Sequence, residues 1–197
     1  MRLAIIGSAG RRDDADRMTP QLYAAMCSEA RTMVRDVGAT RLVSGGAAFA
    51  DHVAVTLFLE NVVDELDLHL PAAWDGSAYE SRGDGRTANF YHAGFSSACD
   101  LDSLGEIATA VTKGAATSSY RGFKQRNSQV ATADAILAFT FGAGGDNRFW
   151  AGEVLAIEAG LKPGGTADTW NKAVMAKFKR HVDLGQLEYR LSLGPRP

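Results

Sequence analysis

Apolar residues recur along the first third of the chain with the spacings of short strands and of one long helix. Three apolar or alternating segments predict strands: Leu3–Ile6, Leu42–Val43 and Val62–Leu70. Between the first two, the apolar positions from Gln21 to Val37 recur at helical spacing. We expect this helix to begin at Thr19-Pro20 and to end at Gly38, and a further helix to follow the second strand as far as Asn61.

The rest of the chain continues this pattern after an interruption. Pro71–Tyr120 is poor in core residues and rich in aromatic, charged and amide groups, so we interpret it as a cover with helices near Thr87–Ser97 and Leu101–Gly114. The alternative is a peripheral excursion. Beyond it we expect the following elements: a helix at Gly122–Thr132, a central strand at Ala135–Phe141, helices at Phe149–Ala159 and Trp170–Arg180, and an edge strand with a tail after His181.

Strands that alternate with helices and short links predict an α/β fold, with a mainly parallel sheet between two layers of helices. We expect a single domain over residues 1–197, with residues 71–120 as the cover inserted after the third strand. In such sheets ligands bind beyond the carboxyl ends of the strands. The loops at Gly7–Arg12, Ser44–Asp51 and Pro71–Asp75 all follow strands, so we expect them to converge on this edge.

Glycine-rich turns at strand ends are the candidate ligand site. Such turns let the backbone approach a ligand closely, and the N–H groups of a following helix favour a phosphate or carboxylate. The residues predicted to bind on this ground are Gly7, Ser8, Arg11, Ser44, Gly45, Gly46, Gly144 and Gly145. Asp51 would meet a sugar hydroxyl or face solvent. The alternative is that these glycines only pack helices against strands.

Composition narrows the class of protein. The chain is 46% hydrophobic and 22% charged, with a net charge of −2, which is typical of a soluble globular domain and gives no general case for nucleic-acid binding. No apolar run reaches the ~18 residues of a membrane span, and the first apolar run is too short for a signal peptide. Cys27 and Cys99 lack a partner pattern and the four histidines are scattered, so we expect no metal or cofactor and a cytoplasmic location.

The order of these motifs resembles the SLOG superfamily of Rossmann-like proteins. The segments that carry the resemblance are GSAGRR, SGGAAFAD, FKQRNSQVATADAILAF and PGGTADT, within residues 1–180. The superfamily includes the phosphoribohydrolases of the Lonely Guy type, which activate cytokinins, and the DNA-processing protein A family. The resemblance implies a nucleotide ligand and a homodimer.

The phosphoribohydrolases use an arginine and a glutamate of a PGGxGTxxE loop on the glycosidic bond of a nucleoside monophosphate. By this resemblance Arg126 is the arginine and Asn127 lies beside it in the site. PGG matches Pro163, Gly164 and Gly165, and with Thr166 as the threonine the glutamate position falls on Thr169, beside Asp168. A second alignment places the glycine pair at Gly144-Gly145 and leaves Glu153 downstream. Neither placement reproduces the motif.

Cleavage of an N-glycosidic bond needs a carboxylate near the anomeric carbon and a group that helps the base to leave. The candidate catalytic residues are Glu80, Arg126, Glu153 and Asp168. Asp168 would equally cap a helix, and Glu153 would equally face solvent. Three functions stay open: a nucleotide N-glycosidase or deoxyribosyltransferase, a binder or sensor of a nucleotide-derived ligand, and a DNA-processing protein, for which the acidic chain lacks a basic stripe.

Overall fold

A seven-stranded sheet forms the centre of the molecule, with the strand order β4-β3-β2-β1-β5-β7-β6. The structure, a computed structural model, describes residues 1–142, the backbone of residues 147–150 and residues 159–194. Six strands are parallel: β1 (Arg2–Gly7), β2 (Arg41–Ser44), β3 (Glu65–Leu70), β4 (Ala116–Ser119), β5 (Ala135–Thr140) and β7 (Phe178–Asp183). At one edge β6 (Asn147–Trp150) pairs antiparallel with β7.

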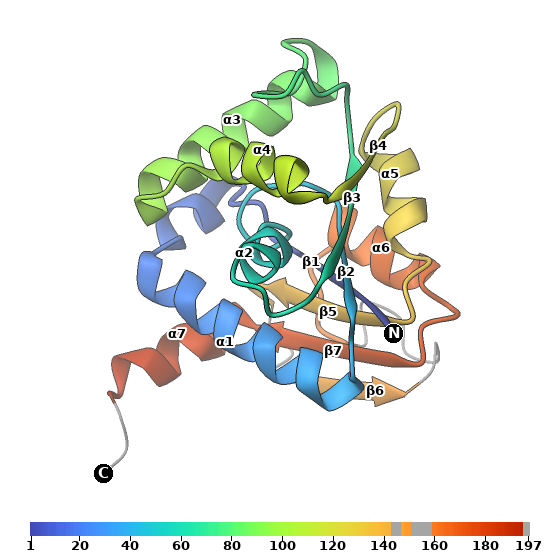
Figure 1. Ribbon diagram of the computed structural model, residues 1–197. Helices are drawn as coiled ribbons and strands as arrows, with labels where there is room; N and C mark the ends of the chain where they lie inside the picture. The colour runs from blue at the N-terminus through green and yellow to red at the C-terminus, as the bar shows by residue number, and fades with distance from the viewer. Residues whose placement is uncertain (143–146, 151–158, 195–197) are drawn as a thin grey trace.

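Helices cover both faces of this sheet (Figure 1). One face carries five helices: α1 (Pro20–Val37), α2 (Val53–Leu59), α3 (Gly83–Cys99), α4 (Ser103–Lys113) and α7 (Leu184–Ser192). The other face carries α5 (Phe123–Val130) and α6 (Gly165–Lys172), seen at the right of Figure 1. A 3-10 helix, η1 (Arg12–Arg17), follows β1. The predicted α/β three-layer fold of the Rossmann-like kind is therefore confirmed.

The two apolar cores explain why the central strands carry almost uninterrupted apolar runs. Successive side chains of a strand point to opposite faces. Leu3 and Ile5 of β1 accordingly join the core under α1 and α2, whereas Ala4 and Ile6 join the core under α5 and α6. All six residues of β5 are buried. A strand that is covered by helices on both sides has no face exposed to water, so nearly all of its residues are apolar.

Local signals at the ends of α1 behave as the sequence predicts. The hydroxyl of Thr19 accepts a hydrogen bond from the Leu22 N–H at 3.1 Å, and Pro20 occupies the first helical turn. Gly38 closes the helix in the left-handed conformation, with φ 61°. The predicted helices of the cover are confirmed as α3 and α4, and both pack against the rest of the domain.

Four predictions at the level of single elements need correction. The predicted helix Trp170–Arg180 is wrong in its second half, because α6 ends at Lys172 and buried strand β7 begins at Phe178. The segment after β7 forms the amphipathic helix α7. The cover contains a further strand, β4, which extends the sheet beside β3. Residues 149–150 belong to β6, and residues 151–158 of that predicted helix lie outside the described residues.

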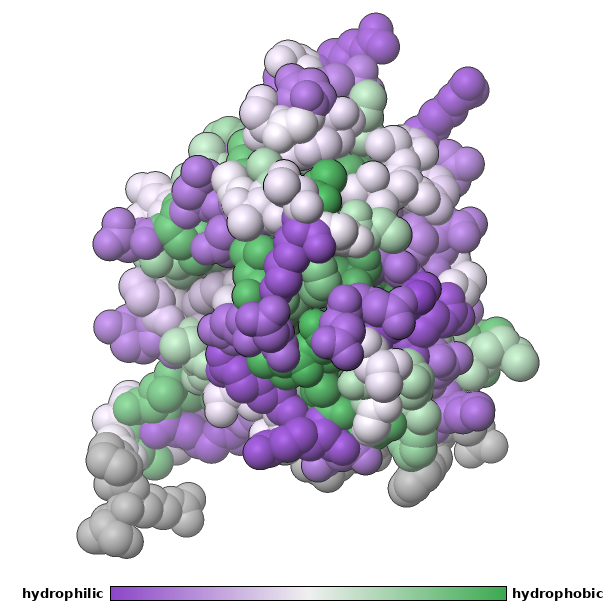
Figure 2. Space-filling view, in the orientation of Figure 1, coloured by the Kyte–Doolittle hydropathy of each residue, from purple (hydrophilic) through white to green (hydrophobic). Residues whose placement is uncertain are grey.

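The strand order creates a reversal between β1 and β5. The chain moves from β1 towards β4 on one side of the sheet and then returns to β5 on the other side of β1. Parallel sheets bind ligands beyond the carboxyl ends of the strands at such a point. Figure 2 shows hydrophilic side chains spread over the visible face of the molecule, with apolar areas between them. None of the helices described is long and apolar enough to cross a bilayer.

Candidate functional site

A cavity of about 510 Å³ lies at the carboxyl ends of β1 and β5, where the strand order reverses. Its walls come from four elements: the loop after β1, the turn that precedes α2, helix α5 and the N-terminal end of α6. Helix α3 of the cover adds Ala88 and Tyr91. The volume falls in the usual range for small-molecule sites, roughly 300–1,000 Å³.

Many of the residues predicted from the sequence meet in this cavity. Those that line it are Gly7, Ser8, Arg11, Asp51, Arg126, Asn127, Gly164, Gly165 and Thr166. Ser44, Gly45, Gly46, Glu80 and Asp168 are absent from its lining. Glu153, Gly144 and Gly145 lie outside the described residues.

Asp51 and Arg126 form a buried ion pair on the cavity wall. The Arg126 Nη1 donates to Asp51 Oδ2 at 2.9 Å, and the Gly7 N–H donates to the other carboxylate oxygen at 3.2 Å. Asp51 is 4% exposed and Arg126 is 8% exposed. Burial raises the pKa of Asp51 above its ordinary value, although Arg126 and the Gly7 N–H favour the charged form. Asp51 is thus engaged by protein groups rather than facing solvent.

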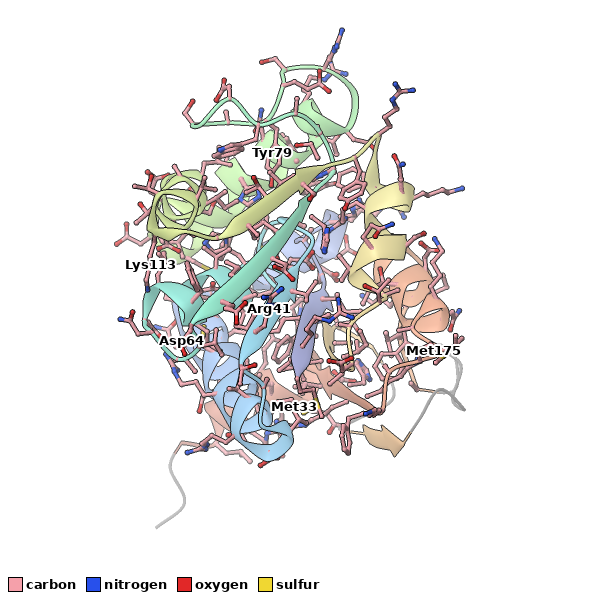
Figure 3. The ribbon with its side chains drawn as sticks, turned by 45° about the vertical axis from the view of Figure 1, so that its right-hand side comes forward. Met33, Arg41, Asp64, Tyr79, Lys113 and Met175 are labelled. Carbon is pink, nitrogen blue, oxygen red and sulfur yellow. The ribbon has the colours of Figure 1, made fainter. Side chains whose placement is uncertain are left out.

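The Ser44-Gly45-Gly46 turn packs directly against this ion pair. A Cβ on Gly45 would lie 1.4 Å from Arg126 Nη1, so glycine at this position makes room for the guanidinium. The Ser44 hydroxyl donates to the Asp51 carbonyl at 2.8 Å. Gly46 has φ +61°, and its carbonyl accepts a hydrogen bond from the Tyr79 hydroxyl at 2.5 Å. Tyr79, labelled in Figure 3, comes from the loop after β3. In this geometry the two glycines accommodate protein side chains.

Backbone donors gather at the N-terminal end of α6. The first N–H groups of a helix have no partner within the helix, and here Gly164 caps the helix without a side-chain hydrogen bond. The Thr166 hydroxyl donates to the Gly7 carbonyl at 2.9 Å and so ties α6 to the end of β1. Asn127 donates to the Gly165 carbonyl at 3.3 Å. This end of α6 is therefore tied to the end of β1 by its own Thr166 and to α5 by Asn127.

Asp14 and Lys162 are cavity residues that the sequence did not single out. The Ser8 hydroxyl donates to Asp14 Oδ2 at 2.8 Å, and the Lys162 Nζ donates to Asp14 Oδ1 at 3.0 Å. The Asp14 side chain is 15% exposed. The available signal was position alone, because Asp14 follows the first glycine turn and Lys162 precedes Pro163-Gly164.

Tyr91 and Phe123 are two further cavity residues that were not singled out. The Arg11 guanidinium lies 5.3 Å from the Tyr91 ring centre and 5.9 Å from the Phe123 ring centre. On the other side, the Arg126 guanidinium lies 5.4 Å from the Phe123 ring centre. Contacts at these distances fit cation–π pairs. The rings come from α3 and α5, which are distant in sequence, so no spacing rule could have joined them.

Two of the candidate catalytic carboxylates are engaged elsewhere. Glu80 accepts a hydrogen bond from Arg82 Nε at 2.7 Å and lines a second, shallower hollow with Pro71 and Tyr120. Asp168 accepts hydrogen bonds from Lys172 at 2.8 Å and Asn127 at 3.1 Å. Partial burial acts to raise the pKa of Asp168, but these hydrogen bonds, together with the positive charges of Lys172 and Lys124, outweigh it and the pKa is lowered. The described carboxylates that line the cavity are Asp13, Asp14 and Asp51.

Comparison with known proteins gives one informative relative. No family model matches the chain, and no solved structure matches it. The chain is 32% identical over 181 residues to the uncharacterized protein R261 of Acanthamoeba polyphaga mimivirus, an alignment that covers 87% of this chain and 90% of the viral protein. The chain therefore belongs to the same protein family as mimivirus R261.

Proposed function

We propose that this protein binds a nucleotide, with a phosphate group held in the cavity between β1, α5 and α6. The observation that carries the proposal is the position of Arg126, which is buried and lines the cavity while only Nη1 bonds to Asp51. Within the described part of the chain, its buried Nε has no hydrogen-bond partner. An arginine of this kind is suited to a phosphate, which accepts several hydrogen bonds from a guanidinium.

Two further groups support an anionic ligand at the same place. The first turn of α6 lines the cavity with Gly165 and Thr166, and a helix N-terminus of this kind favours an anion through its N–H groups and the positive end of the helix dipole. Lys162 lies at the cavity wall as a second cation. The cavity also holds Ser8 and Asp14, whose hydroxyl and carboxylate suit the hydroxyl groups of a sugar.

A second candidate function is cleavage of the nucleotide's N-glycosidic bond, and Asp14 is the observation that favours it. Asp51 is 4% exposed and is paired with the buried Arg126 guanidinium, so Asp51 is a poor nucleophile or base. Asp14 faces the cavity and its two contacts come from Ser8 and Lys162. As a general base, Asp14 would take a proton from water while the water oxygen bonds to the anomeric carbon. The carbon–nitrogen bond would break in the same step, and its electron pair would leave with the base.

A thermal-shift panel tests binding first. The panel contains nucleoside monophosphates, the corresponding nucleosides and ribose 5-phosphate. A ligand at about 100 times its Kd adds about 2.7 kcal/mol, which for a chain of this length raises Tm by about 5–10 °C. We expect monophosphates to stabilise the protein and nucleosides to do so far less. If no phosphate compound raises Tm, the proposed function is wrong.

Variants of one arginine in the cavity wall and one outside it make the test specific. Arg126→Lys keeps the charge beside Asp51 but loses the planar fork, and we expect it to weaken monophosphate binding about tenfold or more. Arg121→Lys is the matched control, since Arg121 is exposed and does not line the cavity. Equal affinity in both variants would contradict the role given to Arg126.

Chromatography of the incubated mixtures then separates binding from cleavage. Release of free base by the wild type and its loss in Asp14→Asn, with nucleotide binding retained, would support the second candidate. Asp16→Asn is the control, because Asp16 is exposed on the same 3-10 helix and lies outside the cavity lining. A bound nucleotide that stays intact with the wild type would leave binding as the function.

A further inference from the structure

Two arginines and two aromatic rings form a layered wall along one side of the cavity, in the order Tyr91, Arg11, Phe123, Arg126. The guanidinium-to-ring-centre distances along this wall are 5.3, 5.9 and 5.4 Å. The four residues come from the loop after β1 and from α3 and α5, and all of them line the cavity. The wall is therefore a tertiary feature that faces the ligand space.

The two arginines of this wall differ in how they are held. Arg126 is buried and paired with Asp51. Arg11 is exposed, and across residues 1–142 and 159–194 no carboxylate forms an ion pair with it. Within the described part of the chain its guanidinium lies against the Tyr91 and Phe123 rings. Arg11 covers one face of the Tyr91 ring, and the ring's second face can stack on another flat group in the cavity.

We propose that Tyr91 binds the nucleobase of the ligand by stacking, with the Arg11 guanidinium supporting its ring from the other face. The inference rests on the proposed function and deepens it, because it names the part of the ligand that is recognised and the orientation of the ligand in the cavity. The phosphate lies at the first turn of α6 beside Arg126, and the base lies against the loop after β1 and α3. Every nucleobase has a π face, so this wall accepts purines and pyrimidines, and the larger purines bind more tightly.

Calorimetric titration with two phosphate compounds tests the inference. Adenosine 5′-monophosphate carries a base, whereas ribose 5-phosphate has the same phosphate and sugar without one. We expect the wild type to bind the nucleotide at least tenfold more tightly, which is the usual size of one base stack. In Arg11→Ala and Tyr91→Leu this preference should shrink to about twofold or less, while the affinity for ribose 5-phosphate stays unchanged.

Two control variants in α3 test whether any loss of an arginine or an aromatic ring from the cover would have the same effect. Arg86→Ala removes an exposed arginine of α3 that lies outside the cavity lining. Phe90→Leu removes the ring next to Tyr91, which is 73% exposed and also outside the lining. Both controls should keep the full preference for the nucleotide. Arg11 is exposed and, among the described residues, forms no ion pair, so Arg11→Ala should melt within about 2 °C of the wild type.

The outcomes separate this inference from the proposed function. If both compounds bind the wild type with equal affinity, the phosphate site stands and the stacking wall is refuted. If Arg11→Ala weakens both compounds equally, Arg11 contacts the phosphate and the stated direction of the ligand is wrong. If neither compound binds, the proposed function fails and this inference fails with it.

Discussion

Replacing Gly45 by alanine should separate the buried pair of Asp51 and Arg126. An added Cβ would lie 1.4 Å from Arg126 Nη1, 2.5 Å from Arg126 Cζ and 2.6 Å from Asp51 Oδ2. Real Cβ atoms do not approach other heavy atoms this closely, so the guanidinium must move. The backbone of Gly45 is not in the left-handed region, and therefore the methyl group itself, rather than backbone strain, is the perturbation.

The size of the effect follows from what the movement leaves behind. Breaking a buried ion pair costs about 3–5 kcal/mol, because an uncompensated charge remains in the interior. Arg126 lines a cavity and regains some hydration when it moves, so we expect a loss of about 3 kcal/mol in the free energy of unfolding. For a chain of 197 residues this lowers Tm by about 6–12 °C.

Urea unfolding and thermal melts of two glycine-to-alanine variants provide the assay. Gly94→Ala is the control, since Gly94 is exposed within α3 and its added Cβ meets nothing within 4 Å. Helix propensity predicts that this control is stabilised by about 0.5–1 kcal/mol. In the double variant Gly45→Ala/Arg126→Ala the two losses should be far from additive. A Gly45→Ala protein that melts within 2 °C of the wild type would refute the reasoning.

Three further predictions concern groups outside the cavity lining. Burial beside His52 lowers the pKa of His92 from 6.5 to about 3, so the stability it contributes is complete above pH 6.5 and is lost as the pH falls towards 3. Urea titrations of His92→Asn should therefore show about 2 kcal/mol less loss between pH 7 and 5 than the wild type, and equal losses would contradict this. Lys113 (Figure 3) donates to the Phe58 carbonyl at 2.6 Å at the end of α2, so Lys113→Met should lower the free energy of unfolding by about 1 kcal/mol, with exposed Lys177→Met as an unaffected control in the same melts. Asp84 accepts a hydrogen bond from the Phe123 N–H at 2.9 Å, and Asp84→Ala should cost about 1 kcal/mol in chemical unfolding and weaken monophosphate binding, whereas an unchanged affinity would show that α5 holds its position without the cap.

The strands and helices with strong local signals could be predicted because one segment contains the whole signal. Ala135–Phe141 reads as a buried strand from its apolar run, and Thr19-Pro20 with Gly38 marks the two ends of α1. The wrong predictions have the opposite cause. β7 carries Lys179, Arg180 and His181 in a buried central position, which a pattern of polar residues does not suggest. These side chains are buried because neighbouring elements supply partners, such as Glu29 of α1 for Arg180.

The candidate site likewise has features that the sequence predicts and features that depend on tertiary contacts. The glycine turns and Arg126 stand out in the sequence, since short glycine segments follow predicted strands. The role of each glycine could not be predicted, because it depends on a side chain from a distant element. Arg126 lies beside Gly45, and Tyr79 contacts Gly46. Which carboxylates line the cavity also depends on tertiary contacts, so the sequence could not identify them.

By itself the sequence determined the α/β class, the strands with continuous apolar runs and the edge of the sheet at which a ligand would bind. These follow from hydrophobic periodicity and turn chemistry, which act between neighbours in the chain. Only the tertiary structure decided that Asp51 is engaged by Arg126, that Asp14 faces the cavity and that Arg11 lies between Tyr91 and Phe123. Those contacts join residues 75 to 112 positions apart, and the order of the strands in the sheet brings them together.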